Sequence, residues 1–144
     1  MRMTKLFPVA LIVVSRGLFA NAALPEVVVI VSADAPVATL SAAQVSDIFL
    51  GKSASFPNGA MAVPIDQADG SAVRQEFYAK ATGKSPQLLK AYWSKLIFTG
   101  QGEPPREATG SAAIKKLVAK NPNFIGYVDK NAVDASVKTV LILR

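Results

Sequence analysis

The sequence contains no cysteine and no histidine among its 144 residues. The absence of cysteine excludes disulfide bonds and thiolate nucleophiles. The absence of histidine removes the most common general base and a frequent transition-metal ligand. We therefore expect neither an enzyme nor a protein that carries a metal or another cofactor.

The sequence also lacks an apolar run of the roughly 20 residues that a membrane-spanning helix needs. Its longest N-terminal apolar stretch, residues 6–14, follows the basic residues Arg2 and Lys5 and is too short for a membrane anchor. The small-x-small pattern Ala20-Asn21-Ala22 comes next. This order is typical of a cleavable secretory signal. The sequence therefore predicts a signal peptide over residues 1–22, a mature domain over residues 23–144, and a periplasmic location.

Without the predicted signal peptide, the sequence contains no cluster of basic residues. The whole chain has 16 Lys and Arg against 10 Asp and Glu, a net charge of +6. Three of the bases and none of the acids lie in residues 1–22, so 13 bases against 10 acids leave the mature chain at +3. Its lysines are scattered, whereas nucleic-acid binding needs clustered positive charge. A nucleic-acid partner is not expected.

What the sequence does contain is an alternation of strand-like and helix-like segments, which is typical of a single α/β domain. The run Glu26 to Ser32 is apolar without alternation, as in a strand covered on both faces. Residues 99–109 are rich in Gly and Pro and predict an irregular loop. Further strands are expected over residues 61–66, 124–128 and 137–143, and helices over residues 42–50, 71–82, 87–98 and 110–121. In the third helix we expect Tyr92, Trp93 and Phe98 in the core.

The segment Asp66-Gln67-Ala68-Asp69-Gly70-Ser71 has the most specific physical meaning. A strand enters a short turn with a glycine, and a hydroxyl residue then opens a helix. Free backbone N–H groups and the positive end of the helix dipole favour an oxyanion at such a place. Equally, Asp69 or Ser71 is a residue that simply caps its own helix. Gly110-Ser111 begins a second helix of the same kind.

Charged residues near this turn leave alternatives open. Arg74 lies one helical turn after Ser71, where it either reaches a bound anion or pairs with Asp69 or Glu76. Asp66 and Asp69 form too small an acidic group to predict a cation site.

Three segments resemble the phosphate-binding proteins of ABC-type transporters. Residues 40–52 (LSAAQVSDIFLGK) are similar to a helix of that family that ends in Ile-Phe-x-Gly-Lys. Residues 63–77 resemble its strand, Asp-Gly-Ser loop and helix, and residues 124–128 (FIGYV) its Ile-Gly-Tyr strand. The segments occur in the family's order, and the alignable region covers nearly all of residues 26–143.

The resemblance implies one lobe of a periplasmic-binding-protein type II fold, with a mostly parallel mixed sheet flanked by helices. Full-length members close two lobes over the anion, and this chain corresponds mainly to the second lobe. A phosphate-like anion as ligand and an ABC permease or another periplasmic protein as partner follow from the same resemblance. Two self-associated lobes, a homodimer, would rebuild a cleft.

The family's phosphate loop has the pattern Arg-x-Asp-Gly-Ser-Gly-Thr, and its Arg, Ser, Gly and Thr bind phosphate. Ser71 matches a binding position, and Asp69 and Gly70 match the turn. Gln67 stands in place of the arginine, so the bidentate charged partner of phosphate is absent.

Two further positions depart from the family's loop. Ala72 hinders close backbone approach, and Val73 replaces a hydroxyl donor. Arg74 could compensate from a position that is not the family's. The candidate ligand-binding residues are therefore Gln67, Asp69, Gly70, Ser71, Ala72 and Arg74.

Two functions follow from these observations. The first is an exported solute-binding module that binds phosphate or another small oxyanion weakly at a helix N-terminus. The alternative is a periplasmic interaction or accessory protein that kept the lobe fold and lost the ligand.

Overall fold

The computed structural model describes residues 23–144, so the predicted signal peptide lies outside the described residues. The described chain alternates strands with helices, as the sequence predicts. Its elements are β1 (Val27–Ser32), α1 (Ala42–Phe49), β2 (Val63–Gln67), α2 (Ala72–Thr82), α3 (Pro86–Phe98), β3 (Arg106–Ala108), α4 (Gly110–Lys120), β4 (Phe124–Asp129), the short 3₁₀ helix η1 (Lys130–Ala132) and β5 (Val137–Leu143).

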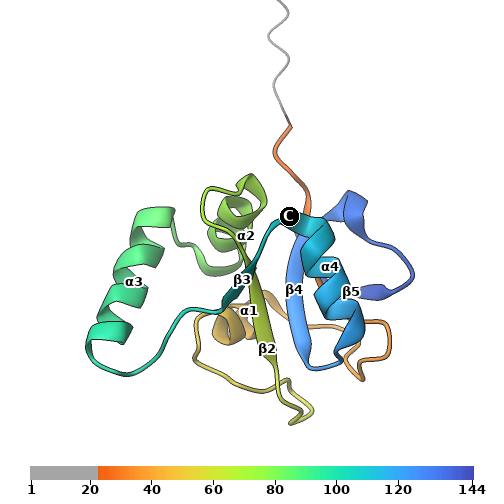
Figure 1. The fold of residues 1–144 in the computed structure, drawn as a ribbon, viewed down its shortest axis with the longest axis horizontal. Coiled ribbons are helices and arrows are strands. Elements are labelled where there is room, and N and C mark those ends of the chain that lie inside the picture. The colour runs from red at the N-terminus through yellow and green to blue at the C-terminus, as the bar shows by residue number, and fades with distance from the viewer. Residues whose placement is uncertain (1–22) are drawn as a thin grey trace, which may run out of the picture.

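The five described strands form one mixed sheet in the order β3-β2-β4-β1-β5 (Figure 1). β2 runs parallel to β3 and β4, whereas β1 pairs antiparallel with β4 and β5. β1 therefore runs opposite to the other four strands. The expected α/β lobe with a mixed sheet is confirmed, and two of the four described strand pairings are parallel.

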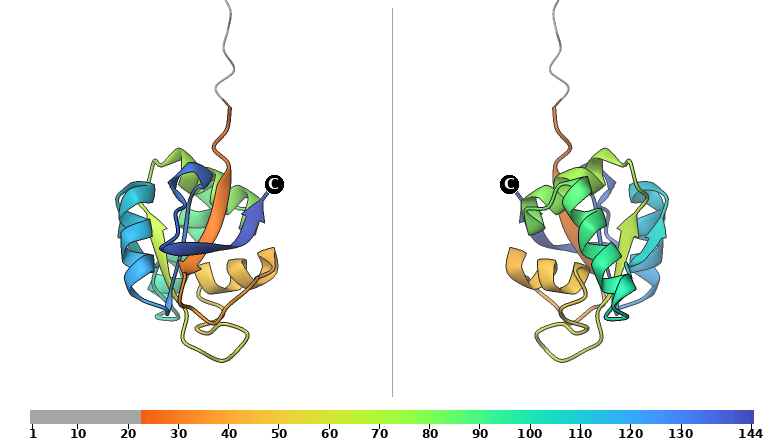
Figure 2. Two further views of the ribbon diagram at one scale, coloured as in Figure 1. Left: turned by 90° about the vertical axis from the view of Figure 1, so that its right-hand side faces the viewer. Right: turned by 90° about the vertical axis from the view of Figure 1, so that its left-hand side faces the viewer.

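Helices cover both faces of this sheet, with α4 on one face and α1 and α2 on the other (Figure 2). Alternate residues of β1 pack into the two resulting cores. Val29 belongs to the cluster of Phe77, whereas Ile30 belongs to that of Ile114 and Val118. All six β1 residues are buried, which explains why the strand shows no polar alternation.

Local capping sets the helix boundaries. Ser41 begins α1 in a reciprocal capping box with Gln44. Ser85 caps α3, and Pro86 occupies its first position, where the missing N–H costs nothing. Gly83 ends α2 at φ 70°, in the left-handed region that glycine adopts without strain.

Two predictions about residues 87–109 are wrong. Residues 106–108 form a short strand, β3, because they pair in parallel with β2, which lies much earlier in the sequence. Phe98 was expected in the core, but 92% of it is exposed at the end of α3. α3 buries Leu89 and Trp93 instead, and Tyr92 is half-buried.

Two kinds of feature are absent from residues 23–144. None of the helices described there combines the length and the apolar character that crossing a bilayer requires. The same residues contain no group of three or more Asp and Glu side chains that could hold a metal ion.

Candidate functional site

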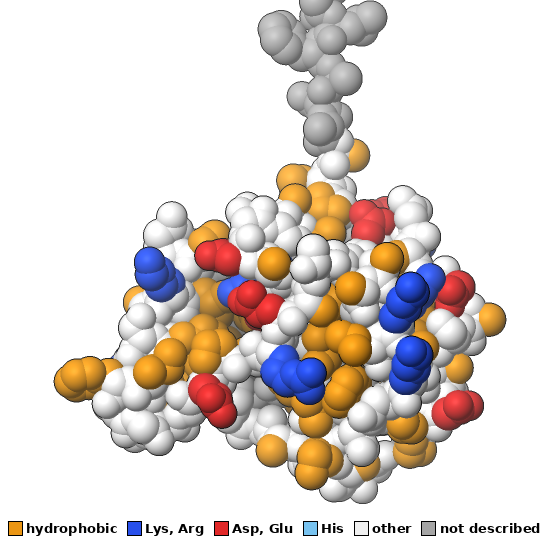
Figure 3. Space-filling view, viewed as in Figure 1, with side chains coloured by type: hydrophobic (Ala, Val, Ile, Leu, Met, Phe, Trp, Pro, Cys, Tyr) orange, Lys and Arg blue, Asp and Glu red, His pale blue; other side chains and the backbone are white. Residues whose placement is uncertain are grey.

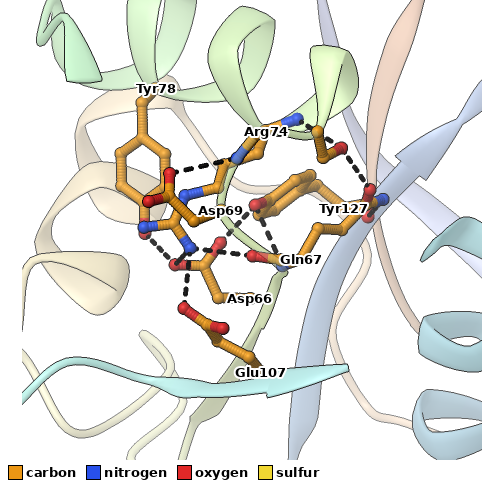
Figure 4. Close-up of polar contacts among 9 residues, drawn as sticks. Asp66, Gln67, Asp69, Arg74, Tyr78, Glu107 and Tyr127 are labelled. Carbon is orange, nitrogen blue, oxygen red and sulfur yellow. Dashed lines mark hydrogen bonds and ion pairs between the residues drawn. The ribbon is translucent and has the colours of Figure 1, made fainter. Parts of the chain in front are cut away.

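The candidate oxyanion residues lie at the end of β2, in the turn that follows it and in the first turn of α2 (Figure 4). Gly70 adopts φ 86°, a conformation that strains any residue with a Cβ, so glycine is required for backbone reasons. Its N–H donates to Asp69 Oδ1 at 3.0 Å. Asp69 and Gly70 are exposed, so the turn faces solvent.

Ser71 is the N-cap of α2, as one of the two sequence hypotheses stated. Its Oγ accepts a hydrogen bond from the Arg74 N–H at 3.2 Å. The backbone N–H groups of Ala72 and Val73 lie at the first two helical positions, where an α-helix offers no intrahelical acceptor. Such groups point along the helix axis toward solvent and can bind an anion.

Gln67 joins this helix start to the start of α4. Its Oε1 accepts from the Ser71 hydroxyl at 2.8 Å. Its Nε2 donates to Ser111 Oγ at 3.2 Å and to the Tyr127 carbonyl at 3.1 Å. Ser111 Oγ also accepts from the Asp129 N–H at 3.0 Å. The two Gly-Ser helix starts seen in the sequence therefore meet at one buried amide.

Arg74 does not pair with either of the partners expected from the sequence. Its Nη1 lies 3.2 Å from Asp66 Oδ2 and 3.1 Å from Glu107 Oε1. The same Nη1 donates to the Gln67 carbonyl at 2.7 Å, and the guanidinium lies over the Tyr78 ring. Glu76 pairs with Lys80 instead. The charge of Arg74 is thus balanced by acidic side chains of β2 and β3.

Asp66 is a buried carboxylate with hydrogen-bond donors on both oxygens. Tyr78 donates to Oδ2 at 2.6 Å, and Tyr127 donates to Oδ1. Burial raises the pKa of the Asp66 carboxyl, while the two hydroxyls and Arg74 oppose that rise. Burial also raises the pKa of both tyrosines well above their usual value, so they remain protonated donors.

The candidate residues divide into two groups by location. Gln67, Ser71 and Arg74 share one hydrogen-bonded network, whereas Asp69, Gly70 and Ala72 lie exposed at its solvent side. The sequence did not predict that Tyr127, Glu107 and Ser111 join this network. Each comes from another element of the sheet or its crossovers, so spacing along the chain carries no signal for them.

A groove opens beside the network, between α2, α3 and the segment before β3 (Figure 3). It encloses about 530 Å³, within the range of small-molecule sites. Apolar side chains line it together with charged ones. The lining includes Asp69, Arg74, Tyr78, Lys90, Trp93 and Ile97. The groove therefore shares Asp69 and Arg74 with the candidate site.

Solved structures of the phosphate-binding family share this fold. A protein from Clostridium perfringens, assigned as a phosphate ABC transporter substrate-binding protein and solved with bound phosphate, matches with a TM-score of 0.65 and 28% identity. The match covers 81% of this chain and 44% of that one. The described domain has the fold of one lobe of a phosphate-type substrate-binding protein. The predicted family resemblance is confirmed at the level of structure.

Two further structures agree on the fold. An ABC-type phosphate transport receptor from Vibrio cholerae matches with a TM-score of 0.63 and 18% identity, over 81% of this chain and 45% of that one. PstS from Borrelia burgdorferi matches with a TM-score of 0.57 and 13% identity, over 81% and 46%. The chain thus spans less than half the length of the solved proteins it matches. No protein-family model and no curated protein matches it.

Proposed function

We propose that this chain is an exported, non-catalytic solute-binding module that binds phosphate or another small oxyanion weakly at the start of α2. The observation that carries the proposal is the meeting of two helix starts at Gln67, with Ser71 and Ser111 beside it. The positive ends of two helix dipoles are directed at one place, which favours negative charge there. The same fold occurs in a protein solved with bound phosphate.

The surrounding charges make this binding weak. Asp66 and Glu107 already balance Arg74, and Asp69 adds a further carboxylate at the rim. A single lobe also leaves the anion in water, where salt screens charge interactions beyond about 8–10 Å. We expect a dissociation constant in the millimolar range, which corresponds to about −4 kcal/mol.

Export belongs to the same proposal. The charged start, apolar stretch and Ala20-Asn21-Ala22 pattern support cleavage after Ala22 and release of residues 23–144 into the periplasm. An ABC permease is the partner that the phosphate transport proteins of this fold suggest. Mass spectrometry of the N-terminus of the exported protein tests the cleavage site, and a mature chain that retains the apolar stretch would contradict it.

Isothermal titration of inorganic phosphate into residues 23–144 tests the binding site. We expect saturable millimolar binding that weakens at least several-fold in Ser71→Ala, because the variant loses a hydroxyl at the anion. Ser85→Ala is the matched control, since Ser85 caps α3 by the same kind of bond to Leu88 N–H. Equal weakening in both variants, or no binding at all in the wild type, would reject the proposal.

The second candidate function is that of an interaction protein, and the exposed surface of α3 favours it. α3 projects beside the body of the domain (Figure 1) and leaves Leu88, Ile97 and Phe98 at least 57% exposed. Monomeric proteins rarely leave grouped apolar side chains in water without a partner. A second copy of the chain would supply the facing lobe that the two-lobed relatives contain.

Sedimentation velocity over a range of concentrations tests this candidate. Self-association that Phe98→Ser abolishes, in a protein that binds no phosphate, would establish the interaction function over the solute-binding one. A monomer at every concentration would remove the second copy as the partner.

A further inference from the structure

Gln67 is the one candidate residue whose side chain is completely buried and completely hydrogen-bonded. Only 1% of the residue is exposed. Its Oε1 accepts one hydrogen bond, and its Nε2 donates two. Both polar atoms of the amide therefore have hydrogen-bond partners within the protein. A buried amide with a full set of partners is fixed in place.

These bonds occupy the groups that an anion would need. A serine hydroxyl has a single proton to donate, and that of Ser71 goes to Gln67 Oε1. The lone pairs of Ser71 accept from the Arg74 N–H. At the other helix start, Ser111 Oγ accepts from Gln67 Nε2 and from the Asp129 N–H. The amide oxygen of Gln67 therefore takes the one proton that the Ser71 hydroxyl could donate at the start of α2 (Figure 4).

We propose that Gln67 determines the affinity and specificity of the oxyanion site, because its carboxamide acts as a built-in neutral substitute for the ligand. The net free energy of anion binding is therefore only the difference between the hydrogen bonds of the anion and those of the amide that it displaces. This inference rests on the proposed function, because it assumes that the ligand is an oxyanion. It goes beyond that function because it attributes the weak binding that we propose to an occupied site as well as to missing charge.

Shortening the side chain should open the site. Gln67→Ala removes Cγ, Cδ, Oε1 and Nε2 and leaves space between the starts of α2 and α4. The Ser71 hydroxyl, which donates to Gln67 Oε1 in the wild type, is then free to donate toward that space. Ser111 Oγ loses the donor Gln67 Nε2 there, so its own proton can turn toward the same space. Hydrogen bonds from such donors to an anion are roughly twice as strong as those to a neutral amide. The expected result is a gain of binding, which a purely structural role for Gln67 would not produce.

The experiment compares inorganic phosphate binding to residues 23–144 of the wild type, Gln67→Ala and Gln67→Glu by isothermal titration. We expect Gln67→Ala to bind at least tenfold more tightly than the wild type. Gln67→Glu keeps the size of the side chain and adds a negative charge, so we expect it to bind no phosphate. Adding Ser71→Ala to Gln67→Ala should remove the gain, since the freed hydroxyl is then missing.

Circular dichroism and the fluorescence of Trp93, the single tryptophan of the chain, report whether each variant folds. If Gln67→Ala is unfolded, Gln67→Ser takes its place, because serine retains a small polar group beside the Tyr127 carbonyl. A folded variant that binds phosphate no more tightly than the wild type overturns the inference. Failure of both variants to fold also overturns it, because Gln67 then has a structural role only.

The two proposals fail in distinguishable ways. Binding by Gln67→Ala without any binding by the wild type would reject the proposed function of the natural chain and support the role of Gln67. Equal binding by both proteins would support the proposed function and reject the role of Gln67.

Discussion

The buried carboxylate of Asp66 needs the residues around it to compensate the cost of its desolvation. Moving a carboxylate out of water is costly unless charges and hydrogen-bond donors compensate it. Here two tyrosine hydroxyls and Arg74 surround the carboxylate. Arg74 is therefore part of the fold's internal balance of charge, and an anion reaches it only in competition with Asp66 and Glu107.

Among the hydroxyls of the network, that of Tyr127 should cost the domain the most stability when it is removed. It donates to Asp66 and accepts from the Gln67 N–H at 3.1 Å, so Tyr127→Phe leaves two buried groups without a partner. We expect a loss of about 1–3 kcal/mol in the free energy of unfolding, measured by urea with Trp93 fluorescence. Tyr92→Phe is the control, because its hydroxyl donates to the Leu50 carbonyl in a more accessible place. Equal losses would contradict this account.

The stability of the domain should depend on pH through Asp66. Because burial raises the pKa of this carboxyl above 3.8, the folded state holds its proton more tightly than the unfolded state. The contribution of Asp66 to stability therefore falls as pH rises from about 3.8 through the raised pKa. The free energy of unfolding of the wild type, relative to Asp66→Asn, should decrease over that range. An increase would show that the pKa of Asp66 is lowered on folding.

Among the elements, those with local signals are the ones that the sequence predicts. Ser71 caps its helix through a side-chain hydrogen bond, as one sequence hypothesis stated, and Ser41 and Ser85 cap α1 and α3 in the same way. β3 was missed because Arg106–Ala108 has no strand composition and is held only by pairing with β2. Phe98 was misplaced because an apolar residue at a helix end can lie beyond the core that the helix covers.

The candidate site also combines a part that local sequence encodes with a part that only the tertiary fold assembles. The Gly70-Ser71 turn is encoded within a few residues, and the structure places it at a helix start as predicted. Glu107, Tyr127 and Ser111 come from β3, β4 and α4, and only the tertiary fold brings them to Arg74 or Gln67. Pairing across the sheet cannot be deduced from sequence spacing.

The contact between β4 and α4 provides a test at the scale of elements. A Cβ on Gly126 would lie 2.5 Å from Ile114 Cγ2 and 3.2 Å from Val118 Cγ2. Gly126→Ala should therefore force α4 away from the sheet and cost about 1–3 kcal/mol in urea unfolding. Gly102→Ala is the control, since its nearest neighbour would be Leu96 Cδ1 at an ordinary 3.9 Å. A stability of Gly126→Ala equal to that of Gly102→Ala would show that the contact is not tightly packed.

At the scale of the whole molecule, the domain is one lobe with its candidate site open to solvent. The solved relatives are more than twice as long as the part that this chain matches. The groove between α2 and α3 and the turn at Gly70 lie side by side, sharing Asp69 and Arg74. A partner that covered the groove would therefore also enclose the proposed anion site and reduce its screening.

The most direct test of the central claim is a residue-resolved titration of ¹⁵N-labelled residues 23–144 with inorganic phosphate, followed by NMR. The account predicts saturable shifts of the Ser71, Ala72 and Val73 amides, with smaller shifts at Ser111, all with one dissociation constant. Shifts confined to the scattered surface lysines, or no saturable shift at tens of millimolar phosphate, a range in which a millimolar site would be occupied, would contradict oxyanion binding at the start of α2.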